Sequence, residues 1–220
     1  MKPIPRLAGT FALAAAVSAA AGCEVIAFPF FIANEIDKQG THTEPAQYEG
    51  LVGKSFAVLI SADRGIQADY PEIVPRLSRR IAEELVANVD VAGYVPGPVI
   101  LQYQYENPSW SAMAFGEVDD ELGVERLVVV DLQEFRLNDP GNRYLYDGVA
   151  AASINVVEAD GSTPDDVTQE LFVRVTFPDA GGFGPEDFSR EEIVSVLASR
   201  FVNRATWPFY DAEIPNDLAY

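Results

Sequence analysis

The sequence predicts an α/β domain with a mixed sheet in two or three layers, in the order β-α-β-α-β-β-β-α. In the first half, short apolar runs typical of strands alternate with segments whose apolar residues recur at helical spacing. In the second half, turn sequences flank two segments of strand-forming residues, which is typical of an antiparallel meander. A capped amphipathic segment near the C-terminus predicts a closing helix.

The N-terminus has the pattern of a secretory signal segment that ends at the single cysteine. A positively charged start precedes an apolar run over residues 7–21, which is too short to span a bilayer as a mature helix. Because Ala20-Ala21-Gly22-Cys23 resembles the lipobox of bacterial lipoproteins, we expect residues 1–22 to be removed and Cys23 to carry fatty acids such as palmitate. Ordinary signal-peptidase cleavage and a buried free cysteine are the alternatives.

Residues 23–49 are predicted to form the lipid anchor and a tether. The apolar stretch 25–36 includes a phenylalanine cluster, and residues 37–49 are polar. The cluster lies among lipid headgroups, or else it packs on the chain's own domain or on a neighbouring subunit. In the Gram-negative lipoproteins that this N-terminus resembles, an Asp after the cysteine retains the protein at the inner membrane. With Glu24 at that position, the resemblance implies an outer-membrane lipoprotein that faces the periplasm.

The charge of the chain restricts its partners. The 220 residues carry a formal charge of -19, and removal of the signal segment takes away Lys2 and Arg6 but no acid, which gives -21. Nucleic acid is excluded as a partner, because phosphate contacts need clustered Lys and Arg and the chain clusters only Arg76, Arg79 and Arg80. Basic partners or a saline habitat fit this charge. A single cysteine also excludes an internal disulfide.

The domain is predicted over residues 50–205 and begins with a strand at Ser55–Ser61, an apolar run rich in strand-forming residues. Apolar residues then recur at every fourth position from Ile73 to Val89, which predicts an amphipathic helix over residues 71–89. The opposite side of this helix carries charged residues and is expected to face solvent.

The middle of the domain is predicted to contribute two strands and a short helix. Val99-Ile-Leu101, bounded by prolines and a glycine, predicts the second strand, and residues 111–122 predict the helix. The run Arg126–Phe135 begins as continuously apolar and ends in alternation, which predicts a strand in the middle of the sheet.

The last part of the domain is predicted to be the meander and the closing helix. Turn sequences bracket residues 144–158, and alternation follows over 171–177. Ser189-Arg-Glu-Glu192 is a capping box, so the helix is expected to start at Ser189 and to end near Arg204. Residues 206–220 are predicted to be an aromatic tail without regular structure.

The residues available for chemistry argue against an enzyme. The only histidine, His42, lies in the predicted tether, which excludes a histidine-based triad and a zinc site in the domain. No glycine-rich loop in a phosphate-binding pattern follows a strand. We therefore expect no catalytic residue, no metal and no cofactor.

Carboxylates are the remaining catalytic option. Asp119, Asp120 and Glu121 are consecutive, so on a helix they point in different directions and cannot form the facing pair of a glycosidase. They are expected to lie on a solvated helix face. The loop acids Asp160, Asp165 and Asp166 lack the spacing of an EF-hand and are interpreted as turn residues.

Two groups of aromatic residues are candidate partner contacts. The first follows the predicted second strand and the second lies in the tail; they are Tyr103, Tyr105 and Trp110, and Trp207, Phe209 and Tyr210. Aromatic side chains in loops stack on sugar rings or anchor protein partners. The competing interpretation, favoured for both groups, is packing against the domain.

Two resemblances follow from these patterns. The element order behind a lipobox, with Ser55–Ser61, Ala82-Glu-Glu-Leu85 and Gly123-Val-Glu-Arg-Leu-Val-Val-Val130, resembles the small periplasmic α/β domain of the secretion lipoprotein CsgG, also found in PelC, LpoB and the amino-terminal domain of TolB. Asn107-Pro-Ser-Trp110, Tyr146-Asp-Gly148 and Phe209-Tyr-Asp211 are similar to features of uncharacterised lipoproteins of planctomycete-like bacteria. Neither resemblance assigns functional residues to this sequence.

The sequence therefore predicts a non-enzymatic assembly, docking or binding module of the cell envelope, of the secretion or export accessory type. Its expected partners are the membrane, through Cys23, and an envelope protein or glycan. Homo-oligomers are also expected, because a meander leaves an edge strand that needs cover. A carboxylate-based glycan hydrolase and a monomeric carrier of a small ligand are the alternatives.

Overall fold

The computed structural model describes residues 40–216, so the signal segment, Cys23 and the phenylalanine cluster lie outside the described residues. Residues Thr43–Ile214 form one compact unit around a five-stranded sheet with the order β3-β2-β4-β5-β6. The strands of this sheet are β2 (Ser55–Ala62), β3 (Gly93–Tyr94), β4 (Arg126–Arg136), β5 (Gly148–Glu158) and β6 (Val167–Phe177). The helices are α2 (Arg64–Asp69), α3 (Ile73–Asn88), α4 (Gly97–Glu106), α5 (Phe115–Leu122) and α6 (Arg190–Thr206).

The sheet is mixed, as the sequence predicts. Strand β2 pairs in parallel with β3 and β4, whereas β4, β5 and β6 are successive antiparallel neighbours. The predicted central strand is confirmed, because β4 is third of the five strands. The predicted order β-α-β-α-β-β-β-α is also confirmed for the main elements.

The position of the second strand was wrong in the sequence prediction. Residues Val99 to Leu101 lie in α4, and the second strand is the two-residue β3, earlier in the chain. Pro98 fits the first turn of a helix, where its missing N–H costs no hydrogen bond. Ile100 and Tyr103, three positions apart, are buried on one face of this helix, whereas Val99 is 49% exposed, so the three residues of the apolar run do not share one face.

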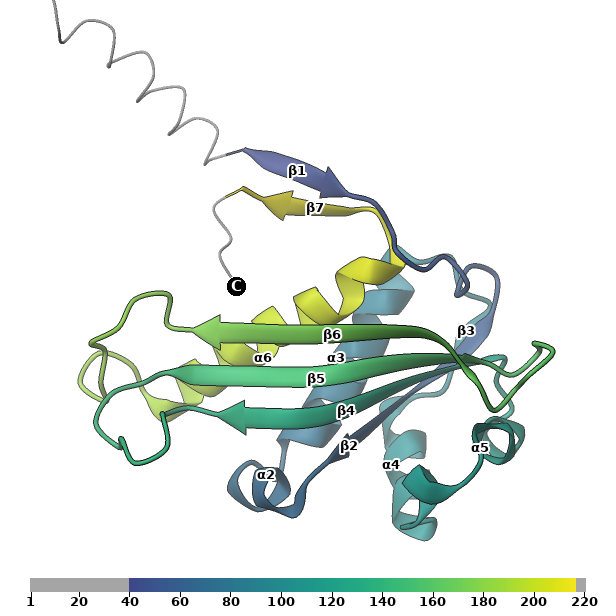
Figure 1. Cartoon of the computed structure of the whole chain (residues 1–220), viewed down its shortest axis with the longest axis horizontal. Coiled ribbons are helices and arrows are strands. Elements are labelled where there is room, and N and C mark those ends of the chain that lie inside the picture. Colours follow the sequence, from purple (N-terminus) through teal and green to yellow (C-terminus); the bar gives the residue numbers. More distant parts are fainter. Residues whose placement is uncertain (1–39, 217–220) are drawn as a thin grey trace, which may run out of the picture. The chain divides into compact units, whose positions relative to one another are not determined.

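Helices α3 and α6 cover one face of the sheet (Figure 1). The large core lies between these helices and the inward-facing residues of β2, β4, β5 and β6. The capping box is confirmed, since Ser189 accepts a hydrogen bond from the Glu192 amide and the Glu192 side chain accepts one from the Ser189 amide. The predicted amphipathic helix is confirmed as α3, with Leu77, Ile81 and Leu85 in this core.

The other face of the sheet is covered only in part. A second core joins α4, α5 and the 3-10 helix η1 (Trp110–Ala112) to β2 and to the first residues of β4. The remainder of this face, over β4, β5 and β6, carries no helix (Figure 1). The domain therefore has three layers at one end of its sheet and two at the other.

Regular structure also occurs in two segments where none was predicted. Strands β1 (Thr41–Glu44), in the predicted tether, and β7 (Ala212–Pro215), in the predicted tail, pair as a two-stranded sheet. The 3-10 helix η2 (Trp207–Phe209) precedes β7. Ala212 and Ile214 are buried while Glu213 is exposed, so this part of the tail has the period-two burial pattern of a strand. The sequence prediction missed the strand because the prolines on either side of it were interpreted as breaks in regular structure.

Candidate docking surface

The uncovered part of the sheet face is the main candidate surface. A row of paired residues crosses it from β2 to β6, namely Ser61, Asp131, Ser153 and Phe172. The Ser61 hydroxyl donates to Asp131 Oδ1 at 2.8 Å. Phe172 is 64% exposed, although it stands in the middle of a long strand. An exposed aromatic ring with small polar neighbours is a surface that can bind a partner.

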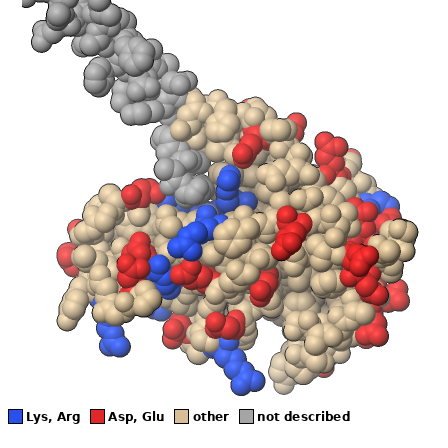
Figure 2. All heavy atoms as spheres, in the orientation of Figure 1, with Lys and Arg blue, Asp and Glu red and all other residues tan. Residues whose placement is uncertain are grey.

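A glutamate organises the charges beside this ring. Glu134 Oε1 accepts from Arg136 Nε at 2.6 Å, and Glu134 Oε2 accepts from Arg174 Nη1 at 2.8 Å. Burial opposes ionisation of this carboxyl, but the two arginines outweigh burial and hold the pKa of Glu134 below its usual value. The two guanidinium groups are thereby fixed over the open face, where Figure 2 shows basic side chains among acidic ones.

Strand β6 adds a backbone edge to the same surface. It is 11 residues long and ends the sheet, and within residues 40–216 no strand pairs with its outer edge. Arg200 Nη1 donates to the Thr176 carbonyl at 2.8 Å and also binds Asp179, which covers the last part of this edge. A long edge strand is a template for pairing with another chain.

The first predicted aromatic group is divided by the structure. Tyr103 and Trp110 are each 8% exposed and belong to the second core. Tyr105, on the outer side of α4, is 86% exposed. The structure therefore places only Tyr105 of this group where a partner can reach most of its side chain; its role as a contact stays a prediction.

The second predicted aromatic group lies where the tail meets the start of the domain. Phe209 is 2% exposed and its ring packs edge-on against Tyr48, with centroids 5.9 Å apart. The Arg204 guanidinium lies 5.7 Å from the centroid of the half-buried Trp207 ring. Tyr210 is also half-buried, and burial raises the pKa of its hydroxyl. Packing explains these positions, and a partner-binding role for them is untested.

A buried arginine connects the start of the domain to the sheet. Arg126 is 6% exposed; its Nε donates to the Gly50 carbonyl at 2.9 Å and its Nη1 to Asp160. Its Nη2 lies 3.8 Å from Glu158 Oε2. Tyr48 donates to the other oxygen of Glu158 at 2.9 Å. The segment that leads from the predicted tether is therefore fixed to the beginning of β4 and the end of β5.

Of the three acids on α5 that were predicted to be solvated, Asp119 is buried. Asp119 is only 4% exposed, and its Oδ2 has no hydrogen-bond partner. Burial, together with the negative charges of Asp120 and Asp165, raises the pKa of the Asp119 carboxyl. Asp165 accepts a hydrogen bond from the Gly116 amide at 2.8 Å, which attaches the β5–β6 loop to α5. The packing of the β5–β6 loop on α5 thus brings Asp165 close to Asp119, although the two acids are far apart in the sequence.

Other kinds of site have less support within the described residues. A groove of about 330 Å³ between α3 and α4 is lined by Glu72, Arg76 and Arg79 together with Pro75, Gly97, Pro98 and Leu101, so it is not the closed apolar cavity of a carrier. Residues 40–216 contain no group of three or more His, Cys, Asp or Glu placed to hold a metal ion. In the same residues, no helix combines the length and apolarity that crossing a membrane requires.

The sequence prediction missed the open face, although a signal for it exists. Phe172 stands in phase with Arg174 and Thr176, on the polar side of the β6 alternation. An aromatic residue at such a position is out of pattern for a solvated face. The missing helix cover over β5 and β6 has no comparable signal, because it depends on where α4 and α5 pack.

Comparisons with known proteins show a likeness of fold alone. No protein-family model matches the chain, and no curated protein is similar in sequence. The PelC dodecamer from Paraburkholderia phytofirmans matches with a TM-score of 0.46 at 11% identity, covering 78% of this chain and 96% of that chain. Lipoprotein GNA1162 from Neisseria meningitidis has a TM-score of 0.44 at 13% identity, covering 68% and 95%. Protein XCC0632 from Xanthomonas campestris, a DUF330 protein, has 0.43 at 11%, covering 76% and 88%.

Proposed function

We propose that this chain is a cell-envelope lipoprotein, anchored through Cys23, that acts without catalysis as a docking or assembly module. The observation that carries the proposal is the uncovered face of β4, β5 and β6, where exposed Phe172 stands on the long edge strand β6, whose outer edge pairs with no strand of residues 40–216. The lipobox-like N-terminus supports a location in the cell envelope, and the outer membrane is the membrane that we propose. The partner is an envelope protein or a second copy of the chain.

Two features of the face favour docking over chemistry. Its carboxylates are engaged, since Asp131 accepts from Ser61 and Glu134 binds two arginines. Phe172 instead offers a large apolar contact at low entropic cost, because its side chain has only two rotatable bonds. The edge of β6 offers backbone hydrogen bonds to the same partner.

Site-specific photocrosslinking in the envelope tests this proposal. A photoreactive phenylalanine analogue replaces Phe172 in the full chain, and a control replaces Tyr144, which is 83% exposed in the β4–β5 loop. We expect one adduct of defined mass from position 172 and none from position 144. An adduct of twice the chain mass identifies a second copy as the partner. The same diffuse products from both positions would contradict docking at this face.

A further inference from the structure

The side chains of β6 on the open face have a self-complementary order. The strand runs from Val167 to Phe177, and its middle residue is the exposed Phe172. Glu170 precedes Phe172 by two positions and Arg174 follows it by two, so all three side chains point to the same face of the sheet. An acid and a base therefore stand at equal distances on either side of an exposed aromatic ring. Reversing the direction of the strand exchanges the acid and the base.

The backbone groups of these three residues point to the outer edge of β6. The Thr176 carbonyl accepts from the Arg200 side chain at 2.8 Å. The next carbonyl points to β5 instead, because a Cβ added to Gly148 would lie 2.6 Å from the Phe177 oxygen. Alternate residues of a strand direct their N–H and C=O groups to opposite edges. All three residues lie an even number of positions from Thr176, so their N–H and C=O groups face away from β5.

The charges on this edge are free to bind a partner. Within residues 40–216, no strand pairs with the outer edge of β6, and Glu170 forms no ion pair. Arg174 Nη1 binds Glu134, but the Arg174 side chain is still 48% exposed. Because a guanidinium carries several N–H donors, it can bind a second carboxylate.

We infer that the occupant of this edge is a second copy of the chain, whose β6 pairs antiparallel with the first about a two-fold axis at Phe172. In this register Phe172 faces its equivalent, and each Glu170 faces Arg174 of the other copy. On the covered face, the buried Leu171 faces the buried Val173 of the other copy. The inference rests on the proposed docking function and names its partner.

Other registers of the same two strands lose this complementarity. An axis at Glu170 or at Arg174 would place like charges opposite each other, which destabilises a sheet. An axis at Leu171 or at Val173 would place each charge opposite an uncharged residue. The axis at Phe172 also gives the longest overlap, because Phe172 is the middle of the strand. Charge and length therefore select the same register.

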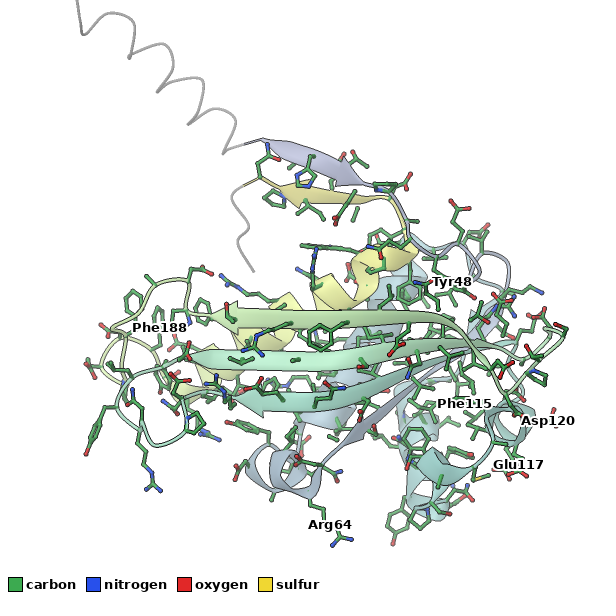
Figure 3. All side chains as sticks on the ribbon, in the orientation of Figure 1. Tyr48, Arg64, Phe115, Glu117, Asp120 and Phe188 are labelled. Carbon is green, nitrogen blue, oxygen red and sulfur yellow. The ribbon has the colours of Figure 1, made fainter. Side chains whose placement is uncertain are left out.

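A charge exchange between two tagged copies tests this pairing. Two full chains with different tags are expressed together, and capture through one tag measures how much of the other chain is bound. The variants are Glu170→Arg and Arg174→Glu, each combined with its own kind and with the other. Asp120→Arg is the matched control, since it makes the same charge change as Glu170→Arg at an exposed acid of α5, which Figure 3 shows away from the middle of β6.

We expect each variant to capture its own kind about tenfold less than the parent does, because two pairs of like charges then face each other. The combination of Glu170→Arg with Arg174→Glu should recover to within about twofold of the parent, since every acid again faces a base. Asp120→Arg should capture its own kind as the parent does. Parent-like self-capture by both variants, or a combination no better than either variant alone, would overturn the inference.

Cysteine pairs test the register without a reversed charge beside Glu134. A Glu170→Cys chain and an Arg174→Cys chain should form a disulfide with each other, because the Cα atoms of facing residues lie about 5.5 Å apart. Neither should link to its own kind, since equivalent residues then lie about 14 Å apart along the strands. The parent gives the background from Cys23, and circular dichroism checks folding. Equal linking in all combinations, or none in the mixed one, would overturn the register.

The capture experiment also separates this inference from the proposed function. A parent that captures no second copy, while position 172 crosslinks to a different envelope protein, would overturn pairing through β6 and leave docking at the open face in place. A parent that captures no second copy and gives no specific adduct from position 172 would contradict both.

Discussion

At the scale of single residues, Asp119 is the clearest conflict between burial and charge. Its raised folded pKa means that its contribution to stability is full below the ordinary Asp pKa and is lost as pH rises through the folded value. Asp119→Asn removes the charge at nearly constant volume. We expect the variant to be about 1 kcal/mol more stable than the parent at pH 7, with the difference shrinking in acid. Urea unfolding across pH measures it, with Asp120→Asn as the exposed control.

Arg126 is the opposite case, a buried charge with its hydrogen bonds satisfied. Arg126→Met leaves the Gly50 carbonyl and the Asp160 carboxylate without their donor. We expect a loss of about 2–3 kcal/mol, below the full cost of a broken buried pair because Asp160 is partly solvated. Arg174→Met, at an arginine whose side chain is 48% exposed, should cost less than about 1 kcal/mol. Equal losses in chemical denaturation would contradict this difference.

The ion pair between Arg126 and Asp160 also predicts how the stability of the protein responds to acid. Hydrogen bonds from Lys54 and Arg126 hold the pKa of Asp160 below its usual value. Its contribution to stability is therefore present above the ordinary Asp pKa and is lost as pH falls through the folded value. The parent should lose stability in that window, and the Arg126→Met variant should lose less there.

At the scale of elements, the capping box of α6 makes a prediction about a single hydroxyl. Ser189→Ala removes the acceptor for the Glu192 amide and leaves the first turn of a 17-residue helix without its cap. A cost of about 1 kcal/mol is expected. Ser109→Ala is the control, because Ser109 precedes the 3-10 helix η1 and its side chain makes no capping hydrogen bond. Thermal unfolding should show a lower midpoint for Ser189→Ala than for Ser109→Ala, and equal midpoints would contradict the role of the Ser189 cap.

Elements with long, regular patterns could be predicted from the sequence, and short ones could not. Five apolar residues at a spacing of four identify α3, and a continuous apolar run identifies β4. The run Val99 to Leu101 is too short to show either the helical or the strand periodicity of apolar residues. The prolines around it were therefore interpreted as the ends of a strand, although they mark the start of α4. The missing helix cover over the open face and the burial of Asp119 depend on the packing of α4 and α5, which no local pattern encodes, although Phe172 on the polar side of β6 was a signal for the open face.

At the scale of the whole molecule, the location depends on Cys23. Cys23→Ser should abolish incorporation of a fatty-acid analogue and release the protein from the membrane fraction, because a single lipidated residue carries the proposed anchor. Labelling of the variant equal to that of the parent would contradict acylation at Cys23. A Lys2→Gln variant, which alters the signal segment but not the cysteine, should still be labelled.

Self-association is the last property of the whole molecule that these features predict. The free edge of β6 and exposed Phe172 favour contact between copies, whereas a mature charge of -21 opposes it. Salt shortens the range of that repulsion from about 10 Å at 0.1 M to about 3 Å at 1 M. Light scattering of the full chain should therefore show a mass that rises with salt. Phe172→Lys should remain monomeric at every salt concentration, whereas Tyr144→Lys should behave as the parent. A parent that is monomeric throughout, at tens of micromolar, would leave a docking module that acts as a single copy.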